Sequence, residues 1–308
     1  MKLKNIISAK DFDKDFLDTI FSKTNDIKKN PEKYYNCLSN KTAALLFFEP
    51  STRTYESFYR AAKNLGMDVV GFRQSYGTSL EKGESLYDTV KMYEGYGVDL
   101  IVLRHYSAGA AKYISEITNI PVINGGDNGR EHPTQALLDA FTIYEKFGRL
   151  DNLKIGFMGD LKYGRTVPSL VYLLSNFDDE FYFIAPDLVQ IRKEIEFYIE
   201  DKNIYYEKIT DMNKVKDVVR ELDVLYVARI QKERIPDPME YEKIRGSYRV
   251  DLNLISNVKE DFIILHPLPR VDEISPEVDK TKYAYYFEQA KNGLFVRMAL
   301  IYYILKNE

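Results

Sequence analysis

Short apolar runs recur along the chain, and most of the segments between them carry apolar residues at helical spacing. An apolar run of this length, bounded by polar or turn-forming residues, is typical of a buried strand. We predict strands at residues 43–48, 69–72, 100–103, 121–123, 153–158, 181–184, 224–227 and 262–265. Strands that alternate with helices favour an α/β fold whose parallel sheets are covered by helices on both faces.

The pattern divides into two halves, because the periodicity restarts near Leu153 after a polar break at residues 148–152. A chain of 308 residues is long enough for two domains. We therefore predict two doubly wound parallel-sheet domains, residues 1–148 and 149–286. The boundary is expected close to the long helix Pro133–Phe147.

The last stretch, residues 287–308, is apolar on most of its faces. Arg297 and the length of the apolar part argue against a membrane helix, so we expect this helix to pack back on the first domain. The N-terminus has no long apolar segment behind it, and we predict neither a signal peptide nor a membrane span. A cytoplasmic protein is the default expectation.

The most informative polar segment follows the first predicted strand. Glu49-Pro50-Ser51-Thr52-Arg53-Thr54 leads into a helical pattern that Gly66 is placed to end. Pro50 stops strand pairing, and Ser51 suits a helix N-cap. Hydroxyls and a guanidinium in the first turn of a helix, beside its free N–H groups, make a good phosphate site. Taken alone, the segment fits equally well a simple Ser cap followed by a surface arginine.

Four other polar motifs also follow predicted strands. They lie at residues 104–105, 159–165, 229–231 and 266–270. Parallel sheets bind ligands at the carboxyl ends of their strands. Because five motifs share this position, we predict one active site in a cleft between the two domains.

Two further segments carry candidate chemistry. His132-Pro133-Thr134-Gln135 opens a helix, and His132 and Gln135 are spaced to face one side, where both could bind a carbonyl group. A helix cap is the plain alternative for His132. Residues 79–85 form a polar loop in which Lys82 could reach an anion, although a mobile surface loop is the simpler interpretation.

Composition narrows the function classes. The net charge of −4 argues against a broad nucleic-acid surface. One cysteine excludes an intrachain disulfide and a zinc site with several thiolates, and three scattered histidines form no metal motif. The sequence contains neither a P-loop nor a glycine-rich dinucleotide fingerprint, which disfavours nucleotide binding.

Taken together, the motifs resemble the aspartate/ornithine carbamoyltransferase family over essentially the whole chain. Residues 48–54, 132–135 and 266–269 match in order and spacing. The aspartate branch is the closer match, through residues 159–167 and 228–234. Pro267 stands where ornithine enzymes carry a cysteine. Arginines also suit a dicarboxylate better than they suit the distal amine of ornithine.

The resemblance implies that the carbamoyl group of carbamoyl phosphate moves to the α-amine of aspartate, a step of pyrimidine biosynthesis, without metal or cofactor. The residues implied to be catalytic are Arg53, Thr54, Lys82, Arg104, His132 and Gln135. Carbamoyl phosphate would be held by Ser51, Thr52, Arg53, Thr54, Ser79, Arg104, His132, Gln135 and Leu268. Aspartate would be held by Lys82, Arg165, Arg229, Gln231, Leu268 and Pro269.

The resemblance further implies that residues 1–148 bind carbamoyl phosphate and residues 149–286 bind aspartate. Ser79 and Lys82 would come from a neighbouring subunit of a homotrimer. The attachment of regulatory chains stays an open question. Three positions depart from the family pattern, since Tyr55 and Tyr59 replace an Arg and a Glu, and Pro168 replaces a frequent His. A transferase for another amino acid and an inactive binding relative are the alternatives.

Overall fold

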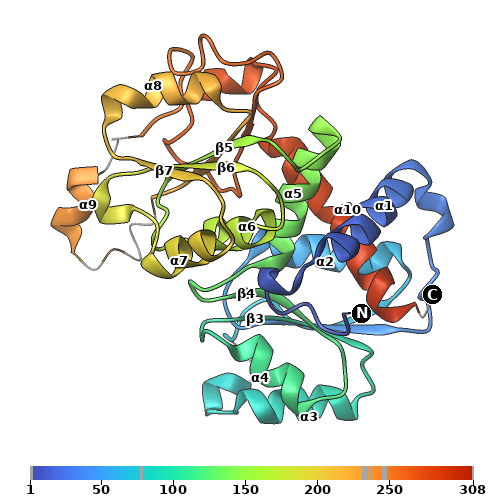
Figure 1. Cartoon of the computed structure of the whole chain (residues 1–308). Coiled ribbons are helices and arrows are strands. Elements are labelled where there is room, and N and C mark those ends of the chain that lie inside the picture. Colours follow the sequence, from blue (N-terminus) through green and yellow to red (C-terminus); the bar gives the residue numbers. More distant parts are fainter. Residues whose placement is uncertain (1–2, 77–78, 231–234, 236, 245–247, 307–308) are drawn as a thin grey trace. The chain divides into compact units, whose positions relative to one another are not determined.

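The computed structural model describes residues 3–76, 79–230, 235, 237–244 and 248–306 (Figure 1). The chain forms two compact units, residues 1–138 with 291–308, and residues 139–290. The chain passes from the first unit to the second within helix α5 (Pro133–Phe147) and returns within helix α10 (Tyr286–Leu305). Within the described residues, no helix is both long and apolar enough to cross a membrane.

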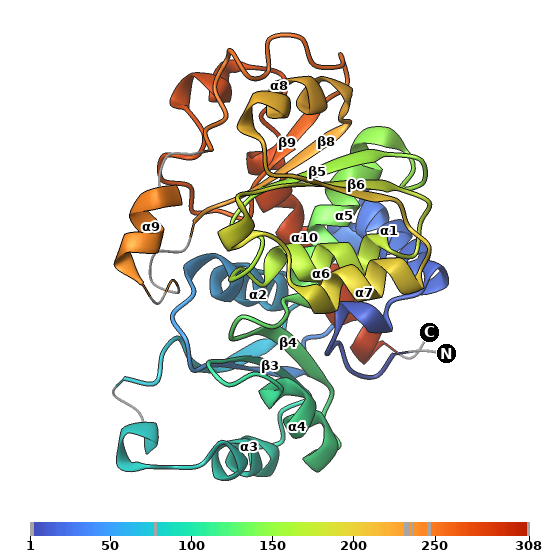
Figure 2. The ribbon, with the colours of Figure 1, turned by 60° about the vertical axis from the view of Figure 1, so that its left-hand side comes forward.

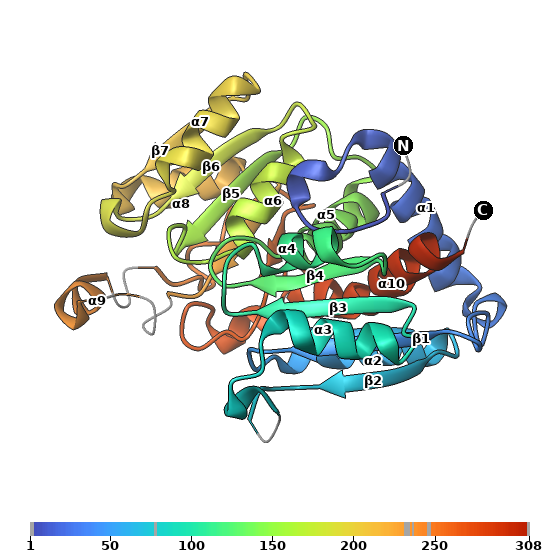
Figure 3. The same ribbon diagram turned by 90° about the horizontal axis from the view of Figure 1, so that it is seen from below.

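The first unit is built on a four-stranded parallel sheet with the order β2-β1-β3-β4 (Figure 3). Its strands are β1 (Thr42–Phe47), β2 (Asp68–Phe72), β3 (Leu100–His105) and β4 (Val122–Asp127). Its further helices are α1 (Lys14–Lys29), α2 (Thr52–Asn64), α3 (Leu86–Gly95) and α4 (Ala110–Ile117).

Alternate residues of β1 face opposite layers of this unit. Ala44 and Leu46 join a buried cluster with side chains of α3 and α4. Phe47 points the other way, and its ring meets that of Tyr55 on α2 at 5.2 Å between centroids. Helices therefore cover both faces of the sheet (Figure 2). This alternation follows from the two-residue period of a strand.

The second unit has a five-stranded parallel sheet with the order β7-β6-β5-β8-β9. Its strands are β5 (Lys154–Gly159), β6 (Glu180–Ile184), β7 (Tyr206–Ile209), β8 (Val224–Ala228) and β9 (Ile263–Leu265). Its helices include α6 (Thr166–Leu174), α7 (Lys193–Asp201), α8 (Met212–Glu221) and α9 (Pro238–Ile244).

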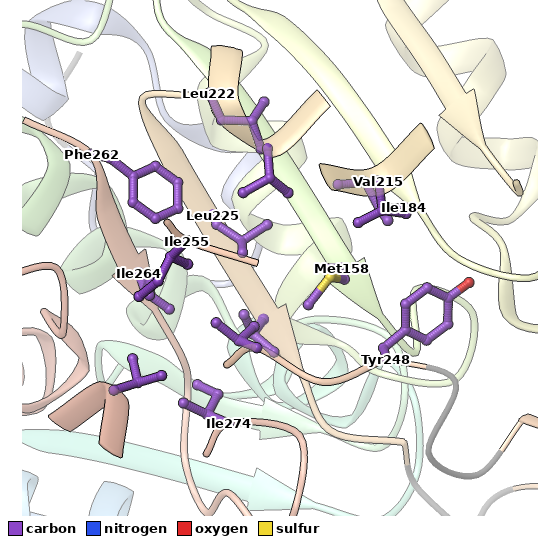
Figure 4. Close-up of a cluster of buried hydrophobic side chains, with 14 of the residues drawn as sticks. Met158, Ile184, Val215, Leu222, Leu225, Tyr248, Ile255, Phe262, Ile264 and Ile274 are labelled. Atoms are coloured by element: carbon purple, nitrogen blue, oxygen red, sulfur yellow. The ribbon is translucent and has the colours of Figure 1, made fainter. Parts of the chain in front are cut away.

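A cluster of buried apolar side chains packs one face of this second sheet (Figure 4). It joins Val215 of α8 to Met158 of β5, Leu225 of β8 and Ile264 of β9. In Figure 1, α6 and α7 lie on the other side of the strands. The prediction of two doubly wound parallel sheets is confirmed, and every predicted strand run overlaps an observed strand. Strand β7 was not predicted.

A buried carboxyl group, that of Asp179, lies just before β6. Its Oδ1 accepts a hydrogen bond from the Leu153 N–H at 2.8 Å, whereas Oδ2 is buried and has no hydrogen-bond partner among the described residues. Burial, strengthened by the nearby Asp151 carboxylate, raises the pKa of Asp179 from 3.8 to about 8. The folded state therefore holds a proton that the unfolded chain releases near pH 4.

We expect Asp179→Asn to stabilise the protein increasingly as the pH rises. Between the unfolded and folded pKa values, the parent loses roughly 1 kcal/mol of unfolding free energy per pH unit through this group, whereas the amide variant has no such loss. Urea denaturation of both proteins from pH 5 to pH 9 measures the difference, which should grow and then level off above about pH 8. Asp201→Asn, at an exposed position of the same unit, serves as control. A pH-independent difference for Asp179→Asn would contradict the assignment.

Candidate active site

The strand order of the first unit brings two predicted motifs together. In the order β2-β1-β3-β4, the chain adds β2 on one side of β1 and then β3 and β4 on the other, so a topological switch point lies between β1 and β3. Ligands bind at such switch points, beyond the carboxyl ends of the strands. The segment after β1 carries Ser51–Thr54, and β3 ends in Arg104 and His105. The Phe48 N–H donates to the Arg104 carbonyl at 2.8 Å, which holds the two strand ends side by side.

The first turn of α2 presents the predicted phosphate donors. Ser51 occupies the N-cap position, but its hydroxyl makes no capping hydrogen bond. The simple cap interpretation therefore does not describe Ser51. Thr52 is exposed and Thr54 is buried. Like Thr52, Arg53 is exposed. The protein around its guanidinium nevertheless removes part of the solvent, and this desolvation lowers the pKa of Arg53.

His132 meets Thr54 directly. His132 Nε2 and Thr54 Oγ1 lie 3.2 Å apart in a buried position, although 78 residues separate them in sequence. The other ring nitrogen, Nδ1, lies 3.5 Å from Oγ1 of Thr134. Gln135 donates its backbone N–H to the His132 carbonyl at the start of α5. His132 therefore does more than open a helix, because its side chain links the start of α5 to the start of α2.

The Arg104 side chain, at the end of β3, is held by two contacts. Its Nη1 donates to the Gly125 carbonyl at 3.3 Å, and its Nε lies 3.4 Å from the Glu49 carboxylate. The register of β3 and β4 shifts at this residue. Burial lowers the pKa of neighbouring His105, against the opposing effect of Glu49. A guanidinium held in this way can meet an anion without first being ordered.

The loop that leads to His132 is anchored by two buried carboxylates. Asp127 accepts hydrogen bonds from the Gly109 and Glu131 backbone N–H groups. Glu131 accepts from the Ser8 hydroxyl and the Ala9 N–H. Burial raises the pKa of Glu131. These contacts hold the backbone on both sides of residues 128–130 and so fix the approach to His132.

The aromatic departures on α2 form a stack in place of an ion pair. The rings of Tyr55 and Tyr59 are nearly parallel, with centroids 6.3 Å apart. The Arg73 guanidinium covers the Tyr55 ring at 4.7 Å and pairs with Glu56 at 2.7 Å. Tyr59 is 38% exposed, so it does not join the buried face that its spacing predicts. At the two departing positions, α2 thus carries ring packing, with Arg73 from outside the helix covering Tyr55.

Ser57 and Arg297 contact the first turns of α2, a role that the sequence analysis did not predict. The Ser57 hydroxyl donates to the Arg53 carbonyl at 2.6 Å, and Arg297 of α10 donates to Ser57 Oγ at 2.8 Å. The Arg297 guanidinium also covers the Phe58 ring at 5.0 Å. Gly293 leaves room for it, because a Cβ there would come within 2.8 Å of Arg297 Nη1. Only the four-residue spacing of Arg53 and Ser57 could have suggested the first contact.

The second unit has a switch point of its own, between β5 and β8. The segment after β5 turns tightly, and Asp160 Oδ1 accepts the backbone N–H groups of Lys162 and Tyr163 at 3.1 and 2.8 Å. Arg165 then takes the N-cap position of α6, and Pro168 sits in its first turn without disrupting the helix. Arg229 follows directly after β8. Arg165 and Arg229 are both half-buried.

The loop after β9 is held by a buried histidine. His266 Nδ1 accepts the Leu268 N–H at 2.7 Å, and its Nε2 lies 2.7 Å from Glu273 Oε1. Burial acts to raise the pKa of Glu273, but hydrogen bonds, led by that to His266, lower it overall. Leu268 has a left-handed backbone, with φ of 53°. His266 therefore shapes the loop that presents the half-buried Leu268 and the exposed Pro269.

The remaining predicted residues are Ser79, Lys82 and Gln231. Lys82 is exposed at the end of a short 3₁₀ helix, Ser79–Lys82. The side chain of Ser79 and the whole of Gln231 lie outside the described part of the chain. Among the described residues, no group of His, Cys, Asp or Glu side chains could hold a metal ion. The predicted residues thus form one set in each unit, and their sharing of a single cleft stays a prediction.

Comparison with known proteins also gives two parts, although the second match includes residues 291–304, which the structure places in the first unit. The carbamoyl-P binding domain of the aspartate/ornithine carbamoyltransferases matches residues 4–145, and their Asp/Orn binding domain matches residues 151–304. The aspartate carbamoyltransferase catalytic subunit of Pyrobaculum calidifontis is 50% identical over 98% of both chains. That of Sulfurisphaera tokodaii is 51% identical over 98% of this chain and 99% of its own.

Solved structures agree with these matches. The catalytic subunit of M. jannaschii aspartate transcarbamoylase is 45% identical, with a TM-score of 0.89 over 98% of both chains. The Trypanosoma cruzi enzyme in complex with N-(phosphonacetyl)-L-aspartic acid is 34% identical, with a TM-score of 0.92 over 99% of this chain and 97% of that one. Because these similarities span nearly the whole sequence, the chain belongs to the aspartate/ornithine carbamoyltransferase family.

Proposed function

We propose that this protein transfers the carbamoyl group of carbamoyl phosphate to the α-amine of L-aspartate, giving N-carbamoyl-L-aspartate and phosphate. The observation that carries the proposal is the meeting of Thr54 and His132 in the first unit, whose switch point lies between β1 and β3, the strand that ends in Arg104 and His105. Related T. cruzi structures hold carbamoyl phosphate with aspartate, and carbamoyl aspartate with phosphate. This reaction would serve pyrimidine biosynthesis.

On the carbamoyl phosphate side, Ser51, Thr52 and Arg53 would bind the phosphate at the positive end of α2. Thr54, Arg104 and His132 would polarise the carbonyl oxygen and stabilise the negative charge that develops on it. Gln135 would orient the carbamoyl amide. The chemistry needs only these donors, because the amine attacks the carbonyl carbon directly and phosphate is a good leaving group.

On the acceptor side, Arg165 and Arg229 would bind the two carboxylates of aspartate, with Gln231, Lys82 and the Leu268–Pro269 backbone. Bidentate guanidinium groups suit a dicarboxylate. A cationic acceptor such as ornithine would instead be repelled. As the new C–N bond forms, the C–O bond to phosphate breaks and the amine loses a proton, for which the departing phosphate is a suitable base.

A turnover assay tests the proposal. Purified protein is incubated with carbamoyl phosphate and a panel of acceptors that includes aspartate, glutamate and ornithine, and carbamoylated product and phosphate are quantified. We expect equal amounts of carbamoyl aspartate and phosphate, with little product from ornithine. Preference for another acceptor would replace aspartate in the proposal. Tight N-(phosphonacetyl)-L-aspartate binding without turnover would point to a defective assay, and absence of both would favour an inactive binding relative.

We further propose that the working unit is a homotrimer in which Ser79 and Lys82 complete a neighbouring subunit's site. The exposed position of Lys82, on a short helix before α3, supports this assignment. Mass measurement in solution tests the assembly. Mixing inactive Lys82→Ala and His132→Ala chains tests the sharing, because hybrid trimers would regain one intact site. A trimer that regains no activity on exchange of chains would contradict shared sites.

A further inference from the structure

A buried carboxylate lies where both connecting helices enter the second unit. Asp139 of α5 is the first residue of that unit and has no exposed surface. Its Oδ2 accepts the Tyr226 hydroxyl at 2.9 Å, and its Oδ1 accepts the Gln289 amide of α10 at 2.6 Å. Helices α5 and α10 run side by side here (Figures 1 and 2). Both carboxyl oxygens therefore accept a hydrogen bond from a side chain.

The hydrogen bonds continue outward from Asp139 in both directions. Gln289 Oε1 accepts the His266 backbone N–H at 2.8 Å, which fixes the orientation of the Gln289 amide. On the other side, the Thr166 side chain is hydrogen-bonded to Tyr226. Burial and the Asp139 carboxylate raise the pKa of Tyr226, so its hydroxyl remains a donor. Tyr226 and Gln289 thus donate to Asp139, and the His266 N–H donates to Gln289 in turn.

Each end of this network lies next to a residue assigned to aspartate. Thr166 directly follows Arg165 at the start of α6. Tyr226 lies in β8, three residues before Arg229. His266 holds Leu268 through its ring nitrogen. One carboxylate is thus connected to the three separate segments that carry Arg165, Arg229 and Leu268.

We propose that the Asp139–Tyr226–Gln289 network is a positioning device that keeps these three segments in register for aspartate binding. The proposal rests on the function proposed above. Asp139 and Tyr226 have no exposed surface, so neither is a catalytic residue, and both act through their neighbours. A buried carboxyl group such as that of Asp139 is tolerated only when its hydrogen bonds are made. Loss of one donor therefore also weakens the hydrogen bonds of the others.

A merely structural network would affect stability alone, whereas a positioning network also affects the Michaelis constant for aspartate. Loosened binding groups lose substrate affinity first, because they hold substrate and transition state alike. Carbamoyl phosphate is assigned mainly to side chains of the other unit, so its Michaelis constant should be insensitive to the network. The contrast between the two substrates therefore separates the two roles.

The test compares two tyrosines that are buried in the same unit. Tyr226→Phe removes a hydroxyl from the network, and Tyr248→Phe removes a buried hydroxyl that has no hydrogen-bond partner among the described residues. For Tyr226→Phe we expect the aspartate KM to rise roughly three- to tenfold, with the carbamoyl phosphate KM within about twofold of the parent value. Tyr248→Phe should change neither constant.

A second pair keeps the test valid if Tyr226→Phe fails to fold. Thr166→Val removes the outer hydroxyl with little change of shape, and Thr166→Ser retains it. We expect a raised aspartate KM for the valine variant and a value near that of the parent for the serine variant. An unchanged aspartate KM in Tyr226→Phe or Thr166→Val, with an active parent, would overturn the positioning role alone. An inactive parent would overturn the proposed function and, with it, this inference.

Discussion

Replacing His132 with alanine is expected to lower kcat by about 10²–10³-fold, the usual cost of losing one donor to a developing oxyanion. His132 is only 4% exposed and lies 3.2 Å from Thr54 Oγ1, so the substitution leaves both an empty donor position and an altered Thr54. Steady-state rates at saturating aspartate and carbamoyl phosphate measure the effect. Near-normal kcat would refute the assigned role.

Two further variants show whether the loss is chemical. His132→Gln keeps an N–H donor at a similar reach, and it should lose less activity than alanine. Thr54→Val removes the other partner of the contact. Because the two side chains touch, the fold-loss of kcat in the double variant should be smaller than the product of the two single fold-losses. A double variant whose fold-loss equals that product would indicate that Thr54 and His132 act independently.

Replacing Gly159 with alanine is expected to destabilise the protein by about 3 kcal/mol or more. Gly159 ends β5 with φ of 111°, and a Cβ there would lie 2.0 Å from the Ala228 carbonyl oxygen. Only glycine fits this backbone and this close approach of strands β5 and β8. The same strand ends lead to Arg165 and Arg229. Protein that still folds should therefore show a raised aspartate KM.

Gly148→Ala provides a matched control for this effect. Gly148 also has a positive φ, 71°, but a Cβ there would meet no atom within 4 Å. Gly148→Ala should lower the free energy of unfolding by only about 1–2 kcal/mol, the penalty of a left-handed backbone by itself. Thermal or urea denaturation of the two variants separates backbone strain from collision. Equal costs would mean that strands β5 and β8 can move apart freely.

The observed strands and the sequence-based predictions differ mainly at β7. Its residues, Tyr206-Glu207-Lys208-Ile209, include two charges and form no apolar run. The strand exists because its backbone pairs with β6 at the edge of the sheet. Edge strands with one exposed side need little apolar sequence. Buried central strands such as β1 and β5 were predictable because both of their faces must be apolar.

The candidate site was predictable as a set of residues but not as an arrangement. Ser51, Thr54 and His132 stood out because their local sequences combine a strand end or a helix start with polar groups. By contrast, Ser57, Asp139 and Gln289 lie within regular helices and carry no local signal. Arg297 was noticed only as a charge that opposes a membrane helix. Their roles depend on which helix faces which, a property that no short segment contains.

Local sequence patterns predicted every described strand except β7, the two helix starts at Ser51 and Pro133, and the family. Periodicity and capping are local properties, readable over a few turns of chain. The pairing of distant segments is visible only in the folded chain, where β1 neighbours β3, β5 neighbours β8, and Thr54 meets His132 across 78 residues. Strand order places the two switch points, and long-range packing aligns the donors on Asp139. Contacts of this kind arise from the whole fold, so no local pattern specifies them.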